Sequence, residues 1–327
     1  MTRVPNSTPG GGALTMRQER GDVRELPADI AALRVALIGY GEVGRIFGGA
    51  LVKAGVAGVT AFDILVDDGA WAREASARST HDGVQLAASM ATAIRDADVV
   101  ISAVTAAATA SAAEQIAHAC LRGAFVLDVN SASPHTKSGG AAAVERAGGR
   151  YVEAAVMSSV PPHGIRVPML LGGPHAEALQ PTLARLGFDA IVRAPTYGVV
   201  SAIKLCRSVF VKGMEALTIE GLLAARRYRV EDEVLKSLAE TYPGLDWERQ
   251  ATWYWQRVVQ HGRRRAEEMR EAAATVTDAG LAPRMAQATA NVQAWVAALR
   301  ADGAFVDMPQ EAGWRELADR VARDAGD

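Results

Sequence analysis

Cysteine is almost absent from this chain of 327 residues, which carries Cys120 and Cys206 alone. Two thiols are too few for a disulfide framework or for a zinc site built from several cysteines. Such sparse use of cysteine is typical of proteins that work in a reducing compartment. We therefore expect a cytoplasmic protein.

An excess of charge of one sign is missing as well. Lysine and arginine number 35 and aspartate and glutamate 37, so the formal net charge is −2. This balance gives no electrostatic footprint for nucleic acid or for an anionic membrane. The longest apolar-leaning run, residues 99–113, falls short of the roughly 20 residues that a spanning helix needs. Residues 1–29 lack the apolar segment of a secretory signal. We expect neither nucleic acid nor a membrane as a partner.

Histidine is scarce and scattered. The six histidines form no HExxH motif and no pair with similar spacing. Because zinc sites draw on closely spaced His, Cys and carboxylate ligands, we expect no metal site.

What the chain does have is the composition of a folded protein, with 49% hydrophobic and 22% charged residues. Its length suggests two domains, since a typical domain has about 150 residues. Residues 1–30 include the stretch PNSTPGGG and are expected to form a disordered tail. We place a dinucleotide-binding domain at residues 31–194 and a helical substrate and dimerisation domain at residues 195–327.

Short apolar runs alternate with helical patterns through the first of these domains. This order predicts βαβ crossovers and an α/β fold, a Rossmann-type doubly wound parallel sheet. The expected strands are residues 33–38, 59–62, 84–88, 99–104, 124–129, 151–157, 167–171 and 190–192. The expected helices are residues 43–54, 90–97, 108–121, 141–147 and 176–186.

From residue 196 onward strand signals vanish, which predicts an all-helical C-terminal domain. Expected helices cover residues 247–274, 283–300 and 311–323, and a first helix from residue 199 could exceed 30 residues. An apolar stripe at helical spacing runs along that first helix, through Val199, Ile203, Cys206, Phe210, Gly213 and Leu217. We interpret Cys206 as core. Trp247, Trp253 and Trp255 are expected to fill a helix–helix or subunit interface, and residues 263–268 to form a solvated helical face.

The text LIGYGEVG places a G-x-G-x-x-G motif between a strand and a helix. Gly39 permits the tight turn, Gly41 lets the backbone approach a pyrophosphate, and Gly44 lets the helix pack closely on the strand. The intervening Tyr40, Glu42 and Val43 belong to the same loop, and the helix N-terminus offers free N–H groups to phosphates. Val104 and Thr105, at the end of the fourth strand, are expected to border the ribose or nicotinamide.

Asp63 ends the next strand, 19 residues beyond Gly44. A carboxylate there accepts hydrogen bonds from the ribose 2′-OH and repels a 2′-phosphate, which favours NAD. Arg73 and Arg78 lie downstream, so NADP remains possible.

Lys204 lies just after the domain boundary and shares a helix face with Ser201 and Ser208. Taken alone, it fits either a solvated lysine or a buried amine. A buried amine has a lowered pKa and can exchange a proton with a substrate oxygen.

Four stretches in order over residues 33–300 resemble the β-hydroxyacid dehydrogenase superfamily, which includes 3-hydroxyisobutyrate and 6-phosphogluconate dehydrogenases. They are LIGYGEVG, DVNSASP at residues 128–134, EAAVMSSVPPHGIRVPMLLGG at residues 153–173 and GVVSAIKLCRS at residues 198–208. The C-terminal text further resembles a sub-branch with a C-terminal domain of unknown function. The resemblance implies that Lys204 is the catalytic proton donor and acceptor, and that the substrate is a small hydroxy acid or related alcohol.

The same resemblance places Ser131, Ser158, Ser159 and Ser208 at the substrate. Met157-Ser158-Ser159 stands where the family has Ser-Gly-Gly, and Arg207 and Ser208 replace two asparagines after the lysine. The altered serine segment leaves open an imine reductase of the same architecture, although such relatives usually carry a different residue at the position of Lys204. A non-catalytic NAD-binding regulatory dimer is an alternative of a different class. In each case we expect a homodimer.

Overall fold

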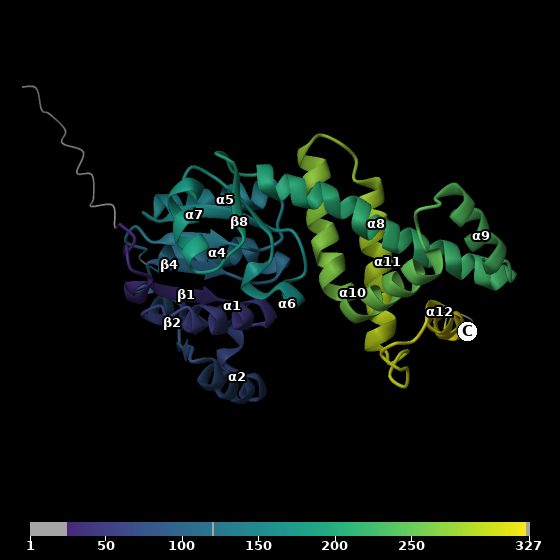
Figure 1. Ribbon diagram of the computed structural model, residues 1–327, viewed down its shortest axis with the longest axis horizontal. Coiled ribbons are helices and arrows are strands. Elements are labelled where there is room, and N and C mark those ends of the chain that lie inside the picture. The colour runs from purple at the N-terminus through teal and green to yellow at the C-terminus, as the bar shows by residue number, and fades with distance from the viewer. Residues whose placement is uncertain (1–24, 120, 325–327) are drawn as a thin grey trace, which may run out of the picture.

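The computed structural model describes residues 25–119 and 121–324. Most of the expected tail and Cys120 lie outside these residues. Residues 25–30 are described, and Leu26 and Ile30 pack against the core of the sheet domain. Figure 1 shows two lobes, a sheet flanked by helices and a helical lobe, with α8 (Val199–Tyr228) leading from one to the other.

An eight-stranded sheet forms the first lobe, with the strand order β3-β2-β1-β4-β5-β6-β7-β8. Its strands are β1 (Arg34–Ile38), β2 (Gly58–Phe62), β3 (Gln85–Leu86), β4 (Val99–Ser102), β5 (Phe125–Asp128), β6 (Arg150–Val156), β7 (Met169–Gly172) and β8 (Ala190–Ala194). The central strands are apolar on both faces, as a sheet covered by helices requires. The predicted Rossmann-type architecture is confirmed.

One strand pair departs from the parallel arrangement. β7 runs antiparallel to β6, pairing Glu153 with Gly172 and Val156 with Met169. The connection between them holds two short helical turns, α6 (Val160–His163) and η4 (Gly164–Arg166). A parallel pairing would need a crossover element, usually an α-helix, that carries the chain back along the sheet, and these short turns do not provide one, so the chain reverses.

Helices of the sheet domain cover both faces and connect the strands. They are α1 (Glu42–Lys53), α2 (Gly69–Asp82), α3 (Met90–Ile94), α4 (Thr109–His118), α5 (Pro134–Arg146) and α7 (Ala176–Arg185), with 3₁₀ turns η1 (Ile30–Ala32), η2 (Ile64–Asp67) and η3 (Ala106–Ala108). Helix α5 begins seven residues earlier than the apolar pattern predicts. Ser133 caps it by accepting a hydrogen bond from the Thr136 N–H, and Pro134 occupies the first turn.

The second lobe is helical, as predicted. Besides α8 it contains α9 (Glu231–Thr241), α10 (Trp247–Asp278), α11 (Arg284–Ala301) and α12 (Trp314–Asp324). In Figure 1, α10 and α11 lie side by side and α8 crosses them. Trp255 and Trp314 are buried at the centre of its core, whereas Trp253 is exposed.

The apolar stripe on α8 does not face the core, and that interpretation of Cys206 was wrong. Its apolar members on the outer surface are Val199, Ile203, Cys206, Phe210 and Leu217. The opposite face, which contains Ser208, Lys212 and Glu215, is the buried one and packs against α10 and α11. Polar residues are tolerated there because their partners on the facing helices are polar too.

The same packing shows that the expectation of a solvated helical face at residues 263–268 was wrong in part. Arg263 is exposed, but Arg265 is buried and forms a bidentate ion pair with the fully buried Glu215. Gln293 donates to the same carboxylate at 3.2 Å. A charged run in sequence thus supplies the polar core between α8, α10 and α11.

Candidate functional site

The glycine loop lies at the carboxyl end of β1, between the neighbouring parallel strands β2 and β4, where the strand order reverses. Gly39 has φ +95°, and a Cβ on it would lie 2.4 Å from the Ala103 carbonyl oxygen. A Cβ on Gly44 would lie 2.1 Å from the Gly39 oxygen, so α1 and the loop pack without space for a side chain. These contacts place the N-terminus of α1 at the crevice where such sheets bind ligands.

Gly41 differs from the other two glycines. An added Cβ there would meet nothing within 4 Å, and the residue is exposed at the N-cap of α1. The open space lies directly before the free N–H groups of the helix, where a pyrophosphate is stabilised by the backbone and by the helix dipole. The loop therefore fits the phosphates of a dinucleotide.

Asp63 lies beside this loop at the end of β2. Its carboxylate accepts hydrogen bonds from the Tyr40 N–H at 2.8 Å and the Leu65 N–H at 3.1 Å. The Tyr40 side chain is buried beneath the loop, so its backbone faces Asp63. Each carboxylate oxygen has a second lone pair, which leaves Asp63 able to accept from a ribose hydroxyl.

An open groove of about 580 Å³ is lined by Phe62 and Ile64, the residues on either side of Asp63 in the chain. Its walls combine apolar side chains with a few polar groups, as small-molecule sites do. Its lining includes Phe62, Ile64, Val66, Ser89, Met90 and His118. Ile64 is 75% exposed. A flat apolar group, such as an adenine ring, would cover that side chain.

The DVNSASP loop follows β5 and is fixed by Asn130. The Asn130 side chain accepts a hydrogen bond from the Val104 N–H at 2.7 Å and donates one to the Ser102 hydroxyl at 2.9 Å. Its own N–H donates to Asp128. The ends of β4 and β5 are thereby tied together, and Ser131 is carried on a rigid loop.

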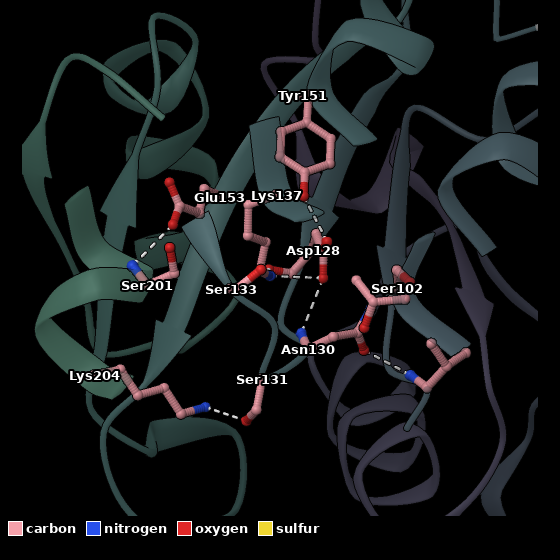
Figure 2. A network of polar contacts seen from close by, with 12 residues as sticks. Ser102, Asp128, Asn130, Ser131, Ser133, Lys137, Tyr151, Glu153, Ser201 and Lys204 are labelled. Atoms are coloured by element: carbon pink, nitrogen blue, oxygen red, sulfur yellow. Dashed lines mark hydrogen bonds and ion pairs between the residues drawn. The ribbon is translucent and has the colours of Figure 1, made fainter. Parts of the chain in front are cut away.

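Asp128 is the buried anchor of this network (Figure 2). It forms an ion pair with Lys137 at 2.8 Å and accepts a hydrogen bond from the Tyr151 hydroxyl at 2.5 Å. Burial and the adjacent Asp128 raise the pKa of Tyr151 well above its usual value, so the phenol stays protonated. A paired and hydrogen-bonded carboxylate of this kind holds its surroundings in place.

Lys204 reaches the same loop from α8. Its Nζ donates a hydrogen bond to the Ser131 hydroxyl at 2.6 Å, and Figure 2 shows the two side chains pointing toward one another. Burial lowers the pKa of Lys204 to about 8, against the opposing attraction of Glu268. An amine with that pKa is present in both charged and neutral forms near neutral pH, as a general acid and base requires.

Helix α10 closes the site from the helical lobe. Glu268 forms an ion pair with Lys212 at 2.5 Å, and Lys212 donates to the Ser208 hydroxyl at 3.4 Å. One turn further on, Glu271 accepts a hydrogen bond from the Ser133 N–H at 2.7 Å. This α10 contact joins the DVNSASP loop of the sheet domain to the helical lobe.

The structure brings some of the sequence-predicted site residues together and leaves others apart. Lys204 and Ser131 are in contact, and Asp63 adjoins the glycine loop. Ser208 is buried and turned toward Lys212. Thr105 is exposed, as are Ser158 and Ser159. Between described residues, no hydrogen bond joins either of these two serines to Lys204.

Sequence reasoning missed several residues of the site. Asn130 lay within a quoted motif, and its position at the end of a parallel strand was a signal that could have found it. Lys137, Lys212 and Glu268 carried no such signal, because each lies in a helix whose buried face is set by its partners.

Two further findings concern the part of the chain that the structure describes. There, no three His, Cys, Asp or Glu side chains gather in a way that could hold a metal ion. Nor does that part contain a helix with the length and apolar character needed to cross a membrane.

Comparison with known proteins assigns both lobes. Residues 34–187 match the family described as the NAD binding domain of 6-phosphogluconate dehydrogenase, and residues 225–296 match a domain of unknown function, DUF1932. A conserved hypothetical protein from Sinorhizobium meliloti 1021 is 36% identical, with a TM-score of 0.71 over 90% of this chain and 97% of that one.

Two more distant structures share the fold. The 3-hydroxyisobutyrate dehydrogenase of Mycobacterium tuberculosis, solved with L-serine, is 19% identical, with a TM-score of 0.66 over 88% of this chain and 99% of that one. An imine reductase from Aspergillus terreus, solved with NADPH4 and a dibenzazepine, is 18% identical, with a TM-score of 0.51 over 83% and 95%.

Proposed function

Because the chain belongs to the 6-phosphogluconate dehydrogenase-like family of NAD-binding proteins, in a branch with a DUF1932 domain, we propose that it is an NAD-dependent oxidoreductase. It transfers a hydride between the nicotinamide and a small hydroxy acid or related alcohol. The observation that carries this proposal is the Lys204–Ser131 hydrogen bond, which sets a partly buried amine at the carboxyl edge of the sheet, near the glycine loop.

The nicotinamide, when bound, supplies or takes up the hydride. The protein's own part is proton transfer and orientation. In reduction, the charged Lys204 donates a proton to the substrate oxygen as it gains negative charge. In oxidation, the neutral Lys204 accepts the hydroxyl proton, and Ser131 fixes the amine at the point of transfer.

The choice of NAD rests on Asp63, whose carboxylate at the loop repels a 2′-phosphate. Arg78 is paired with Glu74 on α2, which leaves it less available to a phosphate. Scarce cysteine supports a cytoplasmic setting.

A homodimer is part of the same proposal. The exposed stripe on α8 runs over Ile203, Phe210 and Leu217, and a second copy of the chain would cover it.

A substrate screen tests the function. Hydroxy acids, their semialdehydes and cyclic imines are offered with NAD(H) and with NADP(H), and absorbance of the reduced nicotinamide is followed. We expect turnover on an alcohol–carbonyl pair. Turnover on imines alone would assign an imine reductase, and tight NADH binding without any turnover would assign a regulatory dimer.

The matched variant for the screen is Lys204→Met, which removes the amine and keeps the length of the side chain. We expect it to retain NADH affinity and to lose about 100-fold or more in kcat, since positioned proton transfer contributes at least that factor. Lys236→Met, on the exposed surface of α9, is the control. Wild-type kcat in Lys204→Met would contradict the mechanism.

A further inference from the structure

The ion pair between Lys212 and Glu268 has no role in the proposed reaction. Lys212 is two turns beyond Lys204 on α8, and its Nζ lies 2.5 Å from the Glu268 carboxylate of α10. The exposed fractions of the two side chains are 8% and 20%. Lys204, Ser208 and Lys212 follow one another at four-residue spacing, so the pair and the amine share one face of α8.

The charges around Lys204 come from three helices and one strand. Glu268 on α10 attracts its proton most strongly, and Lys212 on α8 repels it. Lys137 on α5 and Asp128 on β5 have smaller and opposite effects, and they are paired with each other at 2.8 Å. Of the two carboxylates in this set, Glu268 therefore has the larger effect on how readily Lys204 carries charge.

Glu268 is fixed in its ionised form. Burial opposes its ionisation, but Lys212 and then Lys204 outweigh burial and lower the pKa of the carboxyl to about 2. Lys212 thus holds a permanent negative charge in place near the amine. Since α10 also contacts the DVNSASP loop through Glu271, one helix carries both this charge and a contact to the loop that holds Ser131.

We propose that Glu268, held by Lys212, is the positioning residue that keeps Lys204 able to alternate between its charged and neutral forms, an inference that rests on the proposed function. Burial alone would drive the amine to its neutral form, and a neutral amine has no proton to donate in reduction. The DUF1932 domain then has a defined task, which is to supply the charge that balances the burial of the lysine.

The sign of the effect follows from this arrangement. Removing the charge of Glu268 lowers the pKa of Lys204, and removing the charge of Lys212 raises it. For Glu268 we expect a shift of about one pH unit, the lower end of what a nearby opposite charge produces. Substitutions at the two partners of this ion pair are therefore expected to shift the pKa of Lys204 in opposite directions. A loss of packing would not produce opposite shifts.

The first experiment measures the amine itself and needs no substrate. The full chain is labelled with acetic anhydride at a series of pH values, and acetylation of Lys204 is quantified by peptide mass spectrometry. The variants are Glu268→Gln, Glu268→Asp, Lys212→Met and the double variant Glu268→Gln with Lys212→Met. Glu267→Gln is the matched control, since Glu267 is the adjacent carboxylate and pairs with Arg263.

In the wild type we expect a titration midpoint near the pKa of about 8. It falls by about one unit in Glu268→Gln, rises in Lys212→Met, and stays unchanged in Glu267→Gln. Glu268→Asp keeps the midpoint close to that of the wild type. An unchanged midpoint in Glu268→Gln would overturn the proposal.

Glu268→Gln leaves the Lys212 charge buried and unpaired, which can prevent folding. The double variant leaves no unpaired charge and carries the test in that case. Its midpoint is expected between those of the two single variants, together with a raised midpoint in Lys212→Met. Equal midpoints in Lys212→Met and the wild type would then refute the inference.

The second readout is the pH profile of turnover. In Glu268→Gln, the fall of kcat/KM with rising pH in reduction moves to lower pH, and so does its rise in oxidation. A variant that merely loosened the fold would lower both rates without moving either midpoint. If no substrate is found, the proposed function fails while the labelling experiment still decides the role of Glu268.

Discussion

Glu153 of β6 caps the first turn of α8 by accepting a hydrogen bond from the Ser201 N–H at 2.8 Å. The same fully buried carboxylate accepts a second hydrogen bond from the Gly198 N–H at 2.6 Å. Figure 2 shows the contact between Glu153 and Ser201 on the same side of the network as Lys204, which lies one turn further along α8. A carboxylate of the sheet therefore sets the direction in which α8, the helix that carries Lys204, starts from the sheet domain.

Glu153→Gln tests this relationship. An amide has a single acceptor oxygen, so one of the two N–H groups loses its partner, at a cost of about 1–3 kcal/mol in the free energy of unfolding. We expect kcat to fall more than NADH affinity, because α8 shifts relative to Ser131. Glu220→Gln, at an exposed position of α8, is the control. Unchanged stability and kcat would show that the cap does not position the lysine.

The glycine loop gives a paired prediction for Gly41 and Gly44. Gly44→Ala places a Cβ 2.1 Å from a backbone oxygen and is expected to destabilise the fold by about 1–3 kcal/mol. Gly41→Ala fills open space at φ −78° and leaves stability unchanged, but it weakens NADH binding about tenfold, or 1.4 kcal/mol. Thermal unfolding and NADH titration of both variants measure the two effects. Full NADH affinity in Gly41→Ala would contradict a pyrophosphate at this loop.

We expect cofactor preference to depend on Asp63. NADH is expected to raise the thermal unfolding midpoint more than NADPH, because the Asp63 carboxylate repels the 2′-phosphate of NADPH and weakens its binding. A ligand at 100 times its Kd stabilises a fold by about 2.7 kcal/mol, so the tighter binder gives the larger shift. Asp63→Asn removes the negative charge that repels a 2′-phosphate and should narrow the difference between the two cofactors. Thermal shift with each cofactor measures both effects, with Glu177→Gln at an exposed position of α7 as the control. A larger shift with NADPH in the wild type would reverse the assignment.

The exposed stripe on α8 predicts the oligomeric state. Phe210 is 77% and Leu217 is 63% exposed, and a charge at either position would be buried in the proposed dimer. We expect Phe210→Asp and Leu217→Asp to give monomers with an unchanged circular dichroism spectrum, measured by analytical ultracentrifugation. Leu281→Asp is the control, since Leu281 is 65% exposed outside the stripe. A dimer that survives both stripe variants would place the interface elsewhere.

Local sequence patterns were enough to predict most of the strands and helices of the sheet domain. Strands such as β1 and β4 are apolar runs bounded by turn residues, so composition and spacing were enough to locate them. Helix α2 escaped detection because its sequence is polar and its ends are defined by Asp68 and Gly83 rather than by an apolar stripe. The antiparallel β7 escaped because a strand's direction depends on how its connection folds.

The buried face of α8 could not be inferred in the same way. The apolar pattern selected the face with Phe210, whereas the protein buries the face with Lys212 and Glu215. Periodicity assumes that an apolar face seeks the core, and it fails when a facing helix provides charged partners for a polar one.

The sequence by itself determined the alternation of strands and helices, the glycine turn with its carboxylate at Asp63, and the resemblance that singled out Lys204. These features depend on residues close together in the chain, where spacing and local chemistry are visible. Tertiary structure alone decided that Lys204 meets Ser131 and that Glu268 supplies charge beside it. Those pairs are 73 and 64 residues apart, and the packing of α8 between the sheet and α10 is what brings their charges and hydrogen bonds within reach.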